Sequence, residues 1–493
     1  PSSSGSNRSR TPKPMIPDLP LSTLVEQIRS GTVQAEAVMA AVYERISEHE
    51  PQLNAYRSLL PRKTALARAA GIDQRIATGA SVGRLAGIPV SIKDCICVAD
   101  PELTNTCGSR ILEGYHSPYH ATAVERLLAE DAIIIGITNM DEFAMGSSTE
   151  NSAYDVTRNP CNPEHVPGGS SGGAAVSVAT GMALLALGTD TGGSVRQPAS
   201  FCGVTGIKPT YGTISRYGLI AYGSSLDQIG VLARTAEDCR LACDILQGHD
   251  PKDSTSATQT LVAVPETAEL AGLRVCLPEE YLNAESLDPE VRESVQEIAE
   301  CLRASGATVE QRSLPFLEYV IPTYYILAFA EASSNLGRFD GIRYGVRKQR
   351  ENSLKSLYAT SREKGFGTEV KRRIMLGTFV LSSGYYDQFY GRATQVRELM
   401  RSQVQTLFDE FDLILGPTAP VPPFRFGEKT ADPLTMYLTD LCSVLANLTY
   451  TPAISIPGKP TASGLPVGVQ LMGRRFEDQR LLAIASLLQG LDS

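Results

Sequence analysis

The sequence predicts an α/β protein. A helical pattern over residues 122–131 runs directly into a buried-type strand at 132–137, and residues 273–314 repeat this alternation as strand, helix and strand. The composition, 42% hydrophobic and 20% charged, supplies enough apolar side chains for a large buried core. The length of 493 residues fits one large enzyme domain or several smaller ones.

The N-terminal region is expected to be helical after a polar tail. Residues 1–14 contain basic and small polar residues but no acidic residue and no initiator Met, which resembles the remainder of an organelle transit peptide. A cloning scar or a truncated gene model explains the tail equally well. We therefore expect a disordered tail or transit-peptide remainder at 1–16. Residues 20–60 predict two amphipathic helices, with Thr23 and Glu26 spaced as a capping box.

Short strands and glycine-rich loops follow. Residues 88–93 predict a strand that carries Lys93 within otherwise core-like sequence. Residues 167–212 hold the densest glycine content and predict a helix of small residues between two Gly/Ser loops. Further along, 273–314 could be an insertion or continue the same sheet, 315–412 is mostly helical by pattern, and 414–417 and 453–457 predict returning core strands.

Charge and cysteine usage exclude several classes of protein. A net charge of -9 argues against a broad phosphate-binding face, so any nucleic acid served by this chain is expected to be held by a partner. The ten cysteines lack zinc-site spacing and disulfide-scaffold density, and we interpret them as reduced intracellular thiols, with Cys95 and Cys97 as small apolar fillers. No apolar run approaches the roughly 18 residues of a membrane span. The compartment would be the mitochondrial matrix or chloroplast stroma if the tail is a transit peptide, and the bacterial cytoplasm otherwise.

One serine motif permits two kinds of catalysis. Residues 168–172, Gly-Gly-Ser-Ser-Gly, match the G-x-S-x-G nucleophile elbow of α/β-hydrolases, whose triad also needs a histidine further along the chain. Only one of the five histidines, His249, follows Ser170, and its polar surroundings indicate a surface position. A serine nucleophile here would therefore need another base.

A buried lysine can be that base, because burial disfavours its charged form and lowers its pKa. Lys93 fits this description. The second glycine-flanked serine, Ser194, follows Ser170 by enough chain for a loop, a helix and a return loop, so both serines could face one pocket. The glycine-rich run before Ser194 also suits an oxyanion hole, whose donors would be the backbone N–H groups of Thr191, Gly192 and Gly193.

The runs at 167–173 and 188–212 resemble the amidase signature family. The resemblance implies a mixed central β-sheet sandwiched between helices, with a helical N-terminal segment and a helical insertion. It implies a single domain over 17–493, with core motifs at 81–250 and a more variable helical region at about 285–410. It also implies a Ser-Ser-Lys triad, in which Ser194 is the nucleophile, Ser170 is a bridging serine after a cis peptide bond and Lys93 is the base.

Four further motifs, at 139–146, 225–230, 331–336 and 381–387, resemble the glutamine-hydrolysing A subunits of tRNA-dependent amidotransferases. A glutaminase needs a cation for the substrate's α-carboxylate and an anion for its α-ammonium group. By resemblance, Arg373 is the carboxylate-binding cation and Asp440 is the ammonium partner. Tyr324 is a third expected substrate contact, with Tyr325 as its alternative.

This chain departs from the family pattern in three places. Cys95 replaces the usual asparagine after Lys-Asp, two residues are inserted near Pro101, and residues 448–452 replace an alanine-glycine-leucine-proline run. We expect the last change to alter the wall near the glutamine pocket.

The resemblance implies an enzyme that hydrolyses glutamine and passes ammonia to a B subunit, with a C subunit bracing a heterotrimer. The B subunit would use ATP and Mg and hold most of the tRNA while Glu-tRNA(Gln) becomes Gln-tRNA(Gln), and no metal or cofactor is expected on this chain. The sequence does not indicate whether the complex also amidates Asp-tRNA(Asn). The alternatives are a free-standing amidase acting on small or fatty amides, and a catalytically silent scaffold protein within the complex.

Overall fold

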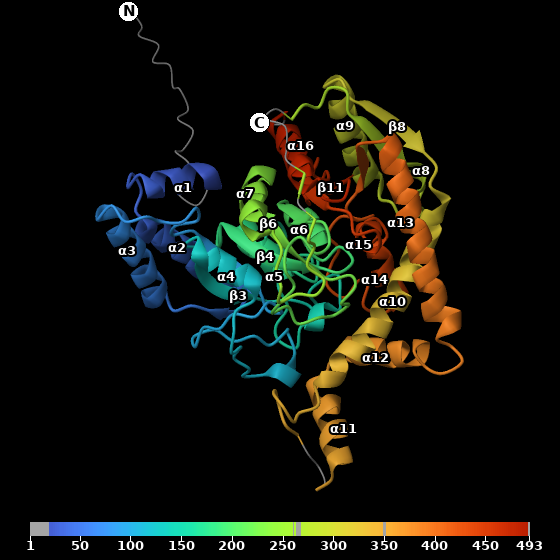
Figure 1. The fold of residues 1–493 in the computed structure, drawn as a ribbon, viewed down its shortest axis with the longest axis horizontal. Coiled ribbons are helices and arrows are strands. Elements are labelled where there is room, and N and C mark those ends of the chain that lie inside the picture. The colour runs from blue at the N-terminus through green and yellow to red at the C-terminus, as the bar shows by residue number, and fades with distance from the viewer. Residues whose placement is uncertain (1–18, 260, 263–267, 349–351, 492–493) are drawn as a thin grey trace, which may run out of the picture.

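A mixed sheet of 11 strands runs through the centre of the molecule, in the order β1-β3-β2-β4-β6-β5-β10-β11-β9-β7-β8 (Figure 1). The computed structural model describes residues 19–259, 261–262, 268–348 and 352–491. Strand β2 is parallel to its neighbours β3 and β4, and β7 is parallel to β8 and β9, whereas the strands between these two groups are antiparallel. The strands are β1 Tyr56–Leu59, β2 Pro89–Lys93, β3 Ile133–Thr138, β4 Leu185–Asp190, β5 Thr205–Lys208, β6 Gln228–Ala233, β7 Arg274–Pro278, β8 Thr308–Arg312, β9 Leu413–Pro417, β10 Ala453–Pro457 and β11 Gly468–Gly473.

Helices surround the sheet, with α1, α2 and α3 at one side of the view in Figure 1 and α8, α9 and α13 at the other. The predicted α/β class and mixed sheet between helices are confirmed. The helices are α1 Leu21–Arg29, α2 Ala35–Leu53, α3 Arg62–Ala77, α4 Thr122–Ala129, α5 Gly172–Ala179, α6 Arg196–Cys202, α7 Ala236–Leu246, α8 Glu279–Leu282, α9 Pro289–Ala304, α10 Val320–Asn335, α11 Leu354–Gly365, α12 Thr368–Val380, α13 Arg392–Glu410, α14 Pro433–Tyr437, α15 Leu445–Leu448 and α16 Asp478–Leu491.

Most elements lie where the pattern predicts them. The succession from α4 to β3 is confirmed, and β7 and β8 continue the same sheet rather than forming a separate insertion. The capping box is wrong: α1 begins at Leu21 after Pro20, so Thr23 lies inside the helix and no side chain caps it. Strands β1, β4, β5, β6 and β11 were not predicted. Strand β4 lies between the two Gly/Ser loops, where the pattern predicted only a helix of small residues.

The central parallel strands place the candidate catalytic residues at one edge of the sheet. Lys93 is the last residue of β2, Asp190 is the last residue of β4, and the loop with Asn139 and Asp141 follows β3. Parallel neighbours end at the same edge, so all three segments meet there. The site is therefore positioned by the most regular part of the fold.

A continuous hydrophobic cluster fills the space between the sheet and its helices, from Leu21 in α1 to Leu488 in α16. The single domain over 17–493 stays a prediction, which this continuity supports. The expected tail at 1–16 lies outside the described residues. Within the part of the chain that the structure describes, no helix combines the length and the apolar character that crossing a membrane requires.

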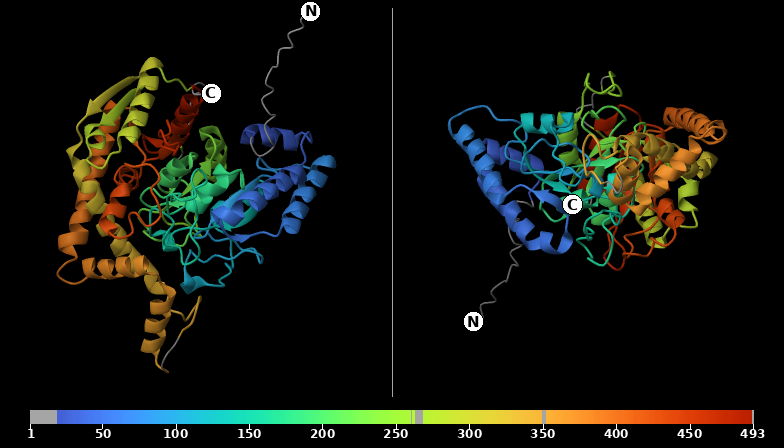
Figure 2. Two further views of the ribbon diagram at one scale, coloured as in Figure 1. Left: turned by 180° about the vertical axis from the view of Figure 1, so that it is seen from behind. Right: turned by 90° about the horizontal axis from the view of Figure 1, so that it is seen from below.

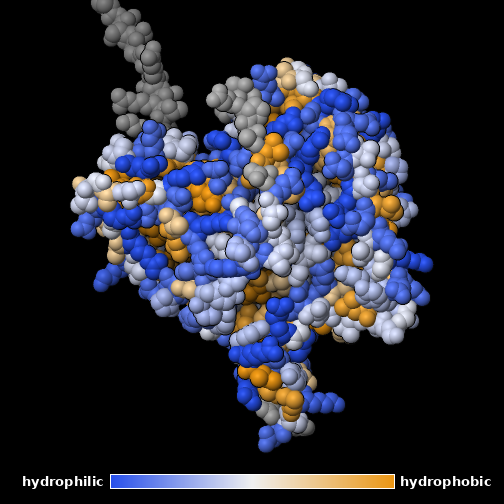
Figure 3. All heavy atoms as spheres, viewed as in Figure 1, coloured by the Kyte–Doolittle hydropathy of each residue, from blue (hydrophilic) through white to orange (hydrophobic). Residues whose placement is uncertain are grey.

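Helix α11 lies on an arm that projects from the body (Figures 1 and 2). Polar residues cover most of the face in Figure 3, and apolar residues gather in small patches, one of them on this arm. Leu354, at the start of α11, is 62% exposed. Scattered apolar exposure of this kind is ordinary for a folded protein.

Candidate active site

Lys93 extends from the end of β2 into a buried cluster of hydroxyl groups. Its Nζ lies 2.7 Å from Ser170 Oγ, 2.8 Å from Ser171 Oγ and 2.8 Å from Thr189 Oγ1. Thr189 belongs to β4, the parallel neighbour of β2, so two adjacent strand ends fix the position of the amine. The predicted contact between Lys93 and Ser170 is present.

Burial lowers the pKa of Lys93, and the acidic groups around it, Cys95, Asp141, Asp190 and Asp227, oppose this effect without cancelling it. Lys93 is 0% exposed and makes no ion pair with any residue that the structure describes. An ammonium group in such a place has no counter-ion in contact. The neutral amine, which can accept a proton, is therefore favoured.

The Ser170 loop is held by backbone contacts. The peptide bond between Gly169 and Ser170 is cis, as the resemblance implies. Asp141 N–H donates to the Ser170 carbonyl oxygen at 3.3 Å, and Gln197 Oε1 accepts from Gly169 N–H at 2.8 Å. A Cβ atom on Gly169 would lie 2.2 Å from Asp141 Oδ2, so no other residue fits there. The loop thus presents the Ser170 hydroxyl to Lys93.

Ser194 lies beside this loop and is the more accessible serine. It is 8% exposed, whereas Ser170 is 0% exposed. The two loops are joined because Ser171 N–H donates to the Ser194 carbonyl oxygen at 3.1 Å. The hydrogen bonds among the described residues do not include one between the Ser170 and Ser194 hydroxyls, so this link of the relay stays a prediction.

The predicted oxyanion donors are not equivalent. Gly193 N–H already donates to Asp190 Oδ1 at 2.9 Å, whereas the N–H groups of Thr191 and Gly192 have no acceptor among the described residues. Gly193 has a φ of 135°, and a Cβ atom there would lie 2.2 Å from Ser443 Oγ. We infer that Thr191 and Gly192 are the free donors and that Gly193 shapes the loop.

Arg373 and Asp440 lie in one aromatic-lined region. Arg373 Nε lies 2.8 Å from Glu369 Oε1, and its Nη1 lies 2.8 Å from the Tyr222 hydroxyl. Asp440 accepts hydrogen bonds from Ser147 Oγ at 2.9 Å and from the Tyr325 hydroxyl at 2.7 Å. Burial raises the pKa of Asp440 to about 6, although these donors and Arg373 oppose the rise. At neutral pH the region therefore presents a cation and an anion.

The structure distinguishes the positions of the adjacent residues Tyr324 and Tyr325. Tyr325 lies between the charged pair, because its hydroxyl binds Asp440 and its ring centroid lies 5.7 Å from the Arg373 guanidinium carbon. Tyr324 instead covers the nucleophile loop, where a Cβ atom on Gly192 would lie 2.6 Å from its hydroxyl oxygen. Both are buried. Tyr324 could contact a substrate at the reacting group, and Tyr325 could contact its α-ammonium end.

A cavity of about 180 Å³ opens beside Arg373, and Ser148, Glu369, Met436 and Tyr437 also line it. Residues 448–452 do not line this cavity, and the expectation that they alter the wall near the glutamine pocket stays a prediction. Thr449 and Thr451 line a different cavity, next to α13. Tyr450, which adopts a positive φ of 63° between them, stacks on Tyr211.

Comparisons with known proteins identify the family. The amidase family model matches residues 37–482. The chain belongs to the amidase family. It is 49% identical over 472 residues to the A subunit of glutamyl-tRNA(Gln) amidotransferase from Acidobacterium capsulatum, covering 95% of this chain and 98% of that one. It is 50% identical over 473 residues to the A subunit from Chlorobium luteolum, covering 95% and 96%.

A solved structure agrees with these relatives. The A subunit of glutamyl-tRNA(Gln) amidotransferase from Thermotoga maritima is 39% identical, with a TM-score of 0.78, and the match covers 96% of this chain and 94% of that one. The predicted resemblance to the amidase signature family and to these A subunits is thus confirmed.

Histidine takes no part in this amidase site. None of the five histidines, all of which the structure describes, hydrogen bonds to Ser170 or Ser194, and His249 is exposed. The nitrogen that contacts Ser170 is Lys93 Nζ. The nucleophile-elbow alternative, which needs a histidine, is therefore not supported.

A buried ion pair beneath the nucleophile loop was not predicted from the sequence. Asp190 and Arg196 are fully buried, and their Oδ1 and Nη2 atoms lie 2.8 Å apart. Burial would raise the pKa of Asp190, but Arg196 lowers it well below the usual range. Arg196 also donates to Asn447 Oδ1 and to the Ser443 carbonyl oxygen, both at 2.8 Å. The sequence did contain an indication of this ion pair, because Asp190 and Arg196 are the only charged residues between 166 and 207.

Replacing Arg196 with methionine is expected to destabilise the amidase by about 3–5 kcal/mol, because the Asp190 carboxylate would stay buried without its partner. The measurement is the urea midpoint of unfolding. The matched control is Arg425→Met, which removes an exposed pair with Glu164 and should cost under about 1 kcal/mol. Equal midpoints for the two variants would contradict the supporting role assigned to Arg196.

Proposed function

We propose that this amidase is the glutamine-hydrolysing component of an amidotransferase that converts Glu-tRNA(Gln) to Gln-tRNA(Gln). The observation that carries the proposal is the Lys93–Ser170 contact at 2.7 Å, beside a nucleophile loop and an Arg373–Asp440 pair suited to an amino acid. The match to the A subunits covers 95% of this chain at 49% identity, and this extent supports glutamine as the substrate.

In the first step, neutral Lys93 accepts the Ser170 hydroxyl proton while Ser170 accepts the proton of Ser194. Ser194 Oγ then attacks the side-chain amide carbon of glutamine, and the carbonyl π electrons move to oxygen. The N–H groups of Thr191 and Gly192 donate to that oxyanion. Arg373 binds the α-carboxylate and Asp440 binds the α-ammonium group, which hold the amide carbon at the serine.

In the second step the C–N bond breaks. The proton held by Lys93 returns through Ser170 to the leaving nitrogen, so ammonia departs and an ester joins the glutamyl group to Ser194. Water, deprotonated by the same relay, then attacks the ester carbon. The bond from this carbon to Ser194 Oγ breaks, the proton held by Lys93 returns through Ser170 to Ser194 Oγ, and glutamate leaves. Each group is back in its starting protonation state.

The ammonia would be used by partners. We propose a B subunit that holds most of the tRNA and uses ATP and Mg, and a C subunit that braces the heterotrimer. The net charge of -9 on this chain agrees with leaving the tRNA to a partner. The cysteines that the structure describes form no disulfide bond with one another, which supports a reducing intracellular compartment.

The test is co-expression with B and C subunits followed by glutamine-dependent amidation of Glu-tRNA(Gln). We expect Gln-tRNA(Gln) to form with glutamine, and ammonia release to rise when the partners are added. Amide hydrolysis that prefers small or fatty amides and ignores the partners would support a free-standing amidase instead.

Replacing Arg373 with glutamine is expected to raise the KM for glutamine by about 10- to 100-fold, since a lost hydrogen bond to a charged group costs about 1.5–3 kcal/mol. The measurement is steady-state ammonia release. Hydrolysis of butyramide, which has no α-carboxylate, should be nearly unchanged.

The chain offers a matched control on α7. Arg240 pairs with Glu237 of its own helix, but its side chain is 44% exposed, whereas that of Arg373 is 4% exposed, and it does not line the cavity beside Arg373. Arg240→Gln should leave the KM for glutamine close to that of the unmodified chain. An equal rise in KM for the two variants, or an equal loss on butyramide, would count against carboxylate binding by Arg373.

A further inference from the structure

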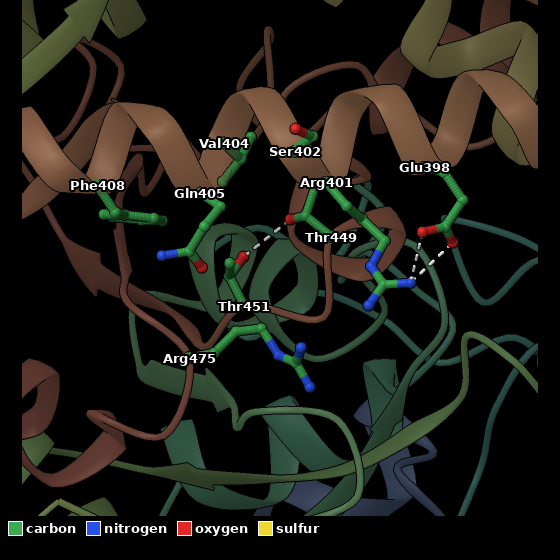
Figure 4. A pocket seen from close by; sticks show the side chains of 9 residues that line it. All are labelled: Glu398, Arg401, Ser402, Val404, Gln405, Phe408, Thr449, Thr451 and Arg475. Carbon is green, nitrogen blue, oxygen red and sulfur yellow. Dashed lines mark hydrogen bonds and ion pairs between the residues drawn. The ribbon is translucent and has the colours of Figure 1, made fainter.

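A second cavity, of about 280 Å³, lies between α13 and the turn that precedes β10. Figure 4 shows Arg401 reaching into it from α13 and Arg475 reaching in from the opposite side, so that two guanidinium groups share one space. Thr451 lies beside the Arg475 side chain, and Gln405 and Phe408 lie towards the other end of the cavity. The triad residues Lys93, Ser170 and Ser194 do not line it.

The charges in this cavity are unbalanced. Arg401 pairs with Glu398 at 2.7 Å, but Arg475 has no ion pair with any described residue, and its Nε is buried without a hydrogen-bond partner. Burial and the neighbouring Arg401 both lower the pKa of Arg475. Two like charges that converge on a partly enclosed space are stabilised by an anion between them.

Tyr450 forms the back of this arrangement. Its ring lies 4.5 Å from the Arg397 guanidinium carbon and 4.7 Å from that of Arg401, and it stacks on Tyr211 with centroids 4.7 Å apart. Arg397 adds positive charge behind the ring and donates to Ser225 Oγ and the Ser225 carbonyl oxygen. Glu331 accepts hydrogen bonds from the Ser225 N–H and hydroxyl groups. The ring faces are therefore occupied and cannot stack on a ligand.

We propose that this cavity binds a small organic phosphate monoester, with the phosphate between Arg401 and Arg475 and the organic group over Phe408. A phosphate has enough acceptor oxygens for donors that approach from several sides, and here two guanidinium groups and the Gln405 amide border the space. The buried side chains of Val404 and Phe408 provide an apolar floor. This binding is separate from the proposed glutamine hydrolysis.

The experiment is isothermal titration calorimetry of the full chain with phenyl phosphate and, separately, with inorganic phosphate, at matched ionic strength. We expect saturable binding of both, with phenyl phosphate the tighter. Arg475→Gln and Arg401→Gln should each weaken binding by about tenfold or more. The control, Arg425→Gln, removes an arginine that is 66% exposed and does not line the cavity, and should bind as the unmodified chain does.

The proposed site is overturned if the full chain shows no saturable binding of either probe. It is also overturned if Arg475→Gln and Arg401→Gln leave the binding intact. Equal affinity for the two probes overturns the monoester and the role of Phe408. Thermal melting of each variant identifies a folding failure, and two independent arginine variants keep the test decisive if one of them does not fold.

Discussion

Replacing Ser194 with alanine should lower glutamine hydrolysis by at least about 10⁴-fold, because no acyl-enzyme can form without its hydroxyl. The measurement is ammonia release under saturating glutamine. A fluorophosphonate probe provides a second readout: it should label the unmodified chain on Ser194 and leave the alanine variant unlabelled.

Ser177→Ala is the matched control. Ser177 is a buried serine of α5 whose hydroxyl donates to the Ala174 carbonyl oxygen, outside the site. Its loss should leave turnover within about twofold of normal, as for a buried hydroxyl with a local role. Near-normal ammonia release from Ser194→Ala would refute the nucleophile assignment, and an unmodified chain that neither hydrolyses amides nor takes the probe would indicate a silent scaffold.

Replacing Lys93 with methionine should lower kcat/KM by about 10²- to 10⁴-fold, the range expected for loss of a general base. The pH profile tests the role more directly than the rate. Because the neutral amine is the base and burial lowers the pKa of Lys93, activity of the unmodified chain should rise with pH through that lowered pKa. The variant should lose this rise.

The stability of the folded state should also depend on pH through Lys93. A lysine that is neutral when folded binds a proton on unfolding, so its contribution makes the folded state more stable as pH rises towards the unfolded pKa. Lys93→Met should remove that contribution from the melting profile. The exposed Lys459, which pairs with Glu293, is the control site, and Lys459→Met should leave the activity–pH profile unchanged. An activity–pH profile unchanged in Lys93→Met would rule out the base assignment.

The sequence predicted the parts of the site that depend on local patterns. The strand carrying Lys93 and the α4–β3 succession follow from hydrophobic periodicity, and the serines follow from glycine-rich spacing. Strand β4 was missed because its short apolar run follows a helix of small residues after a single turn at Gly181. Periodicity alone cannot distinguish such a run from a continuing helix.

Contacts between distant segments could not be predicted from the sequence. Arg373 on α12 and Asp440 entered through resemblance, and nothing in their spacing indicates that Tyr325 lies between them. The partners of Arg196 depend on the order in which β4, β10 and β11 join the sheet, which the pattern of strands does not specify. The same holds for the second cavity, whose two arginines come from α13 and from the segment after β11.

The support of Arg196 by Ser443, Asn447 and Gln470 has a consequence for synthesis of the chain. The nucleophile loop leaves the ribosome long before the residues that anchor its buried arginine. A nascent chain that ends before β11 has both serines and the lysine but lacks the Gln470 contact. We therefore expect amide hydrolysis to appear only when translation is nearly complete, which would keep incomplete chains from consuming glutamine.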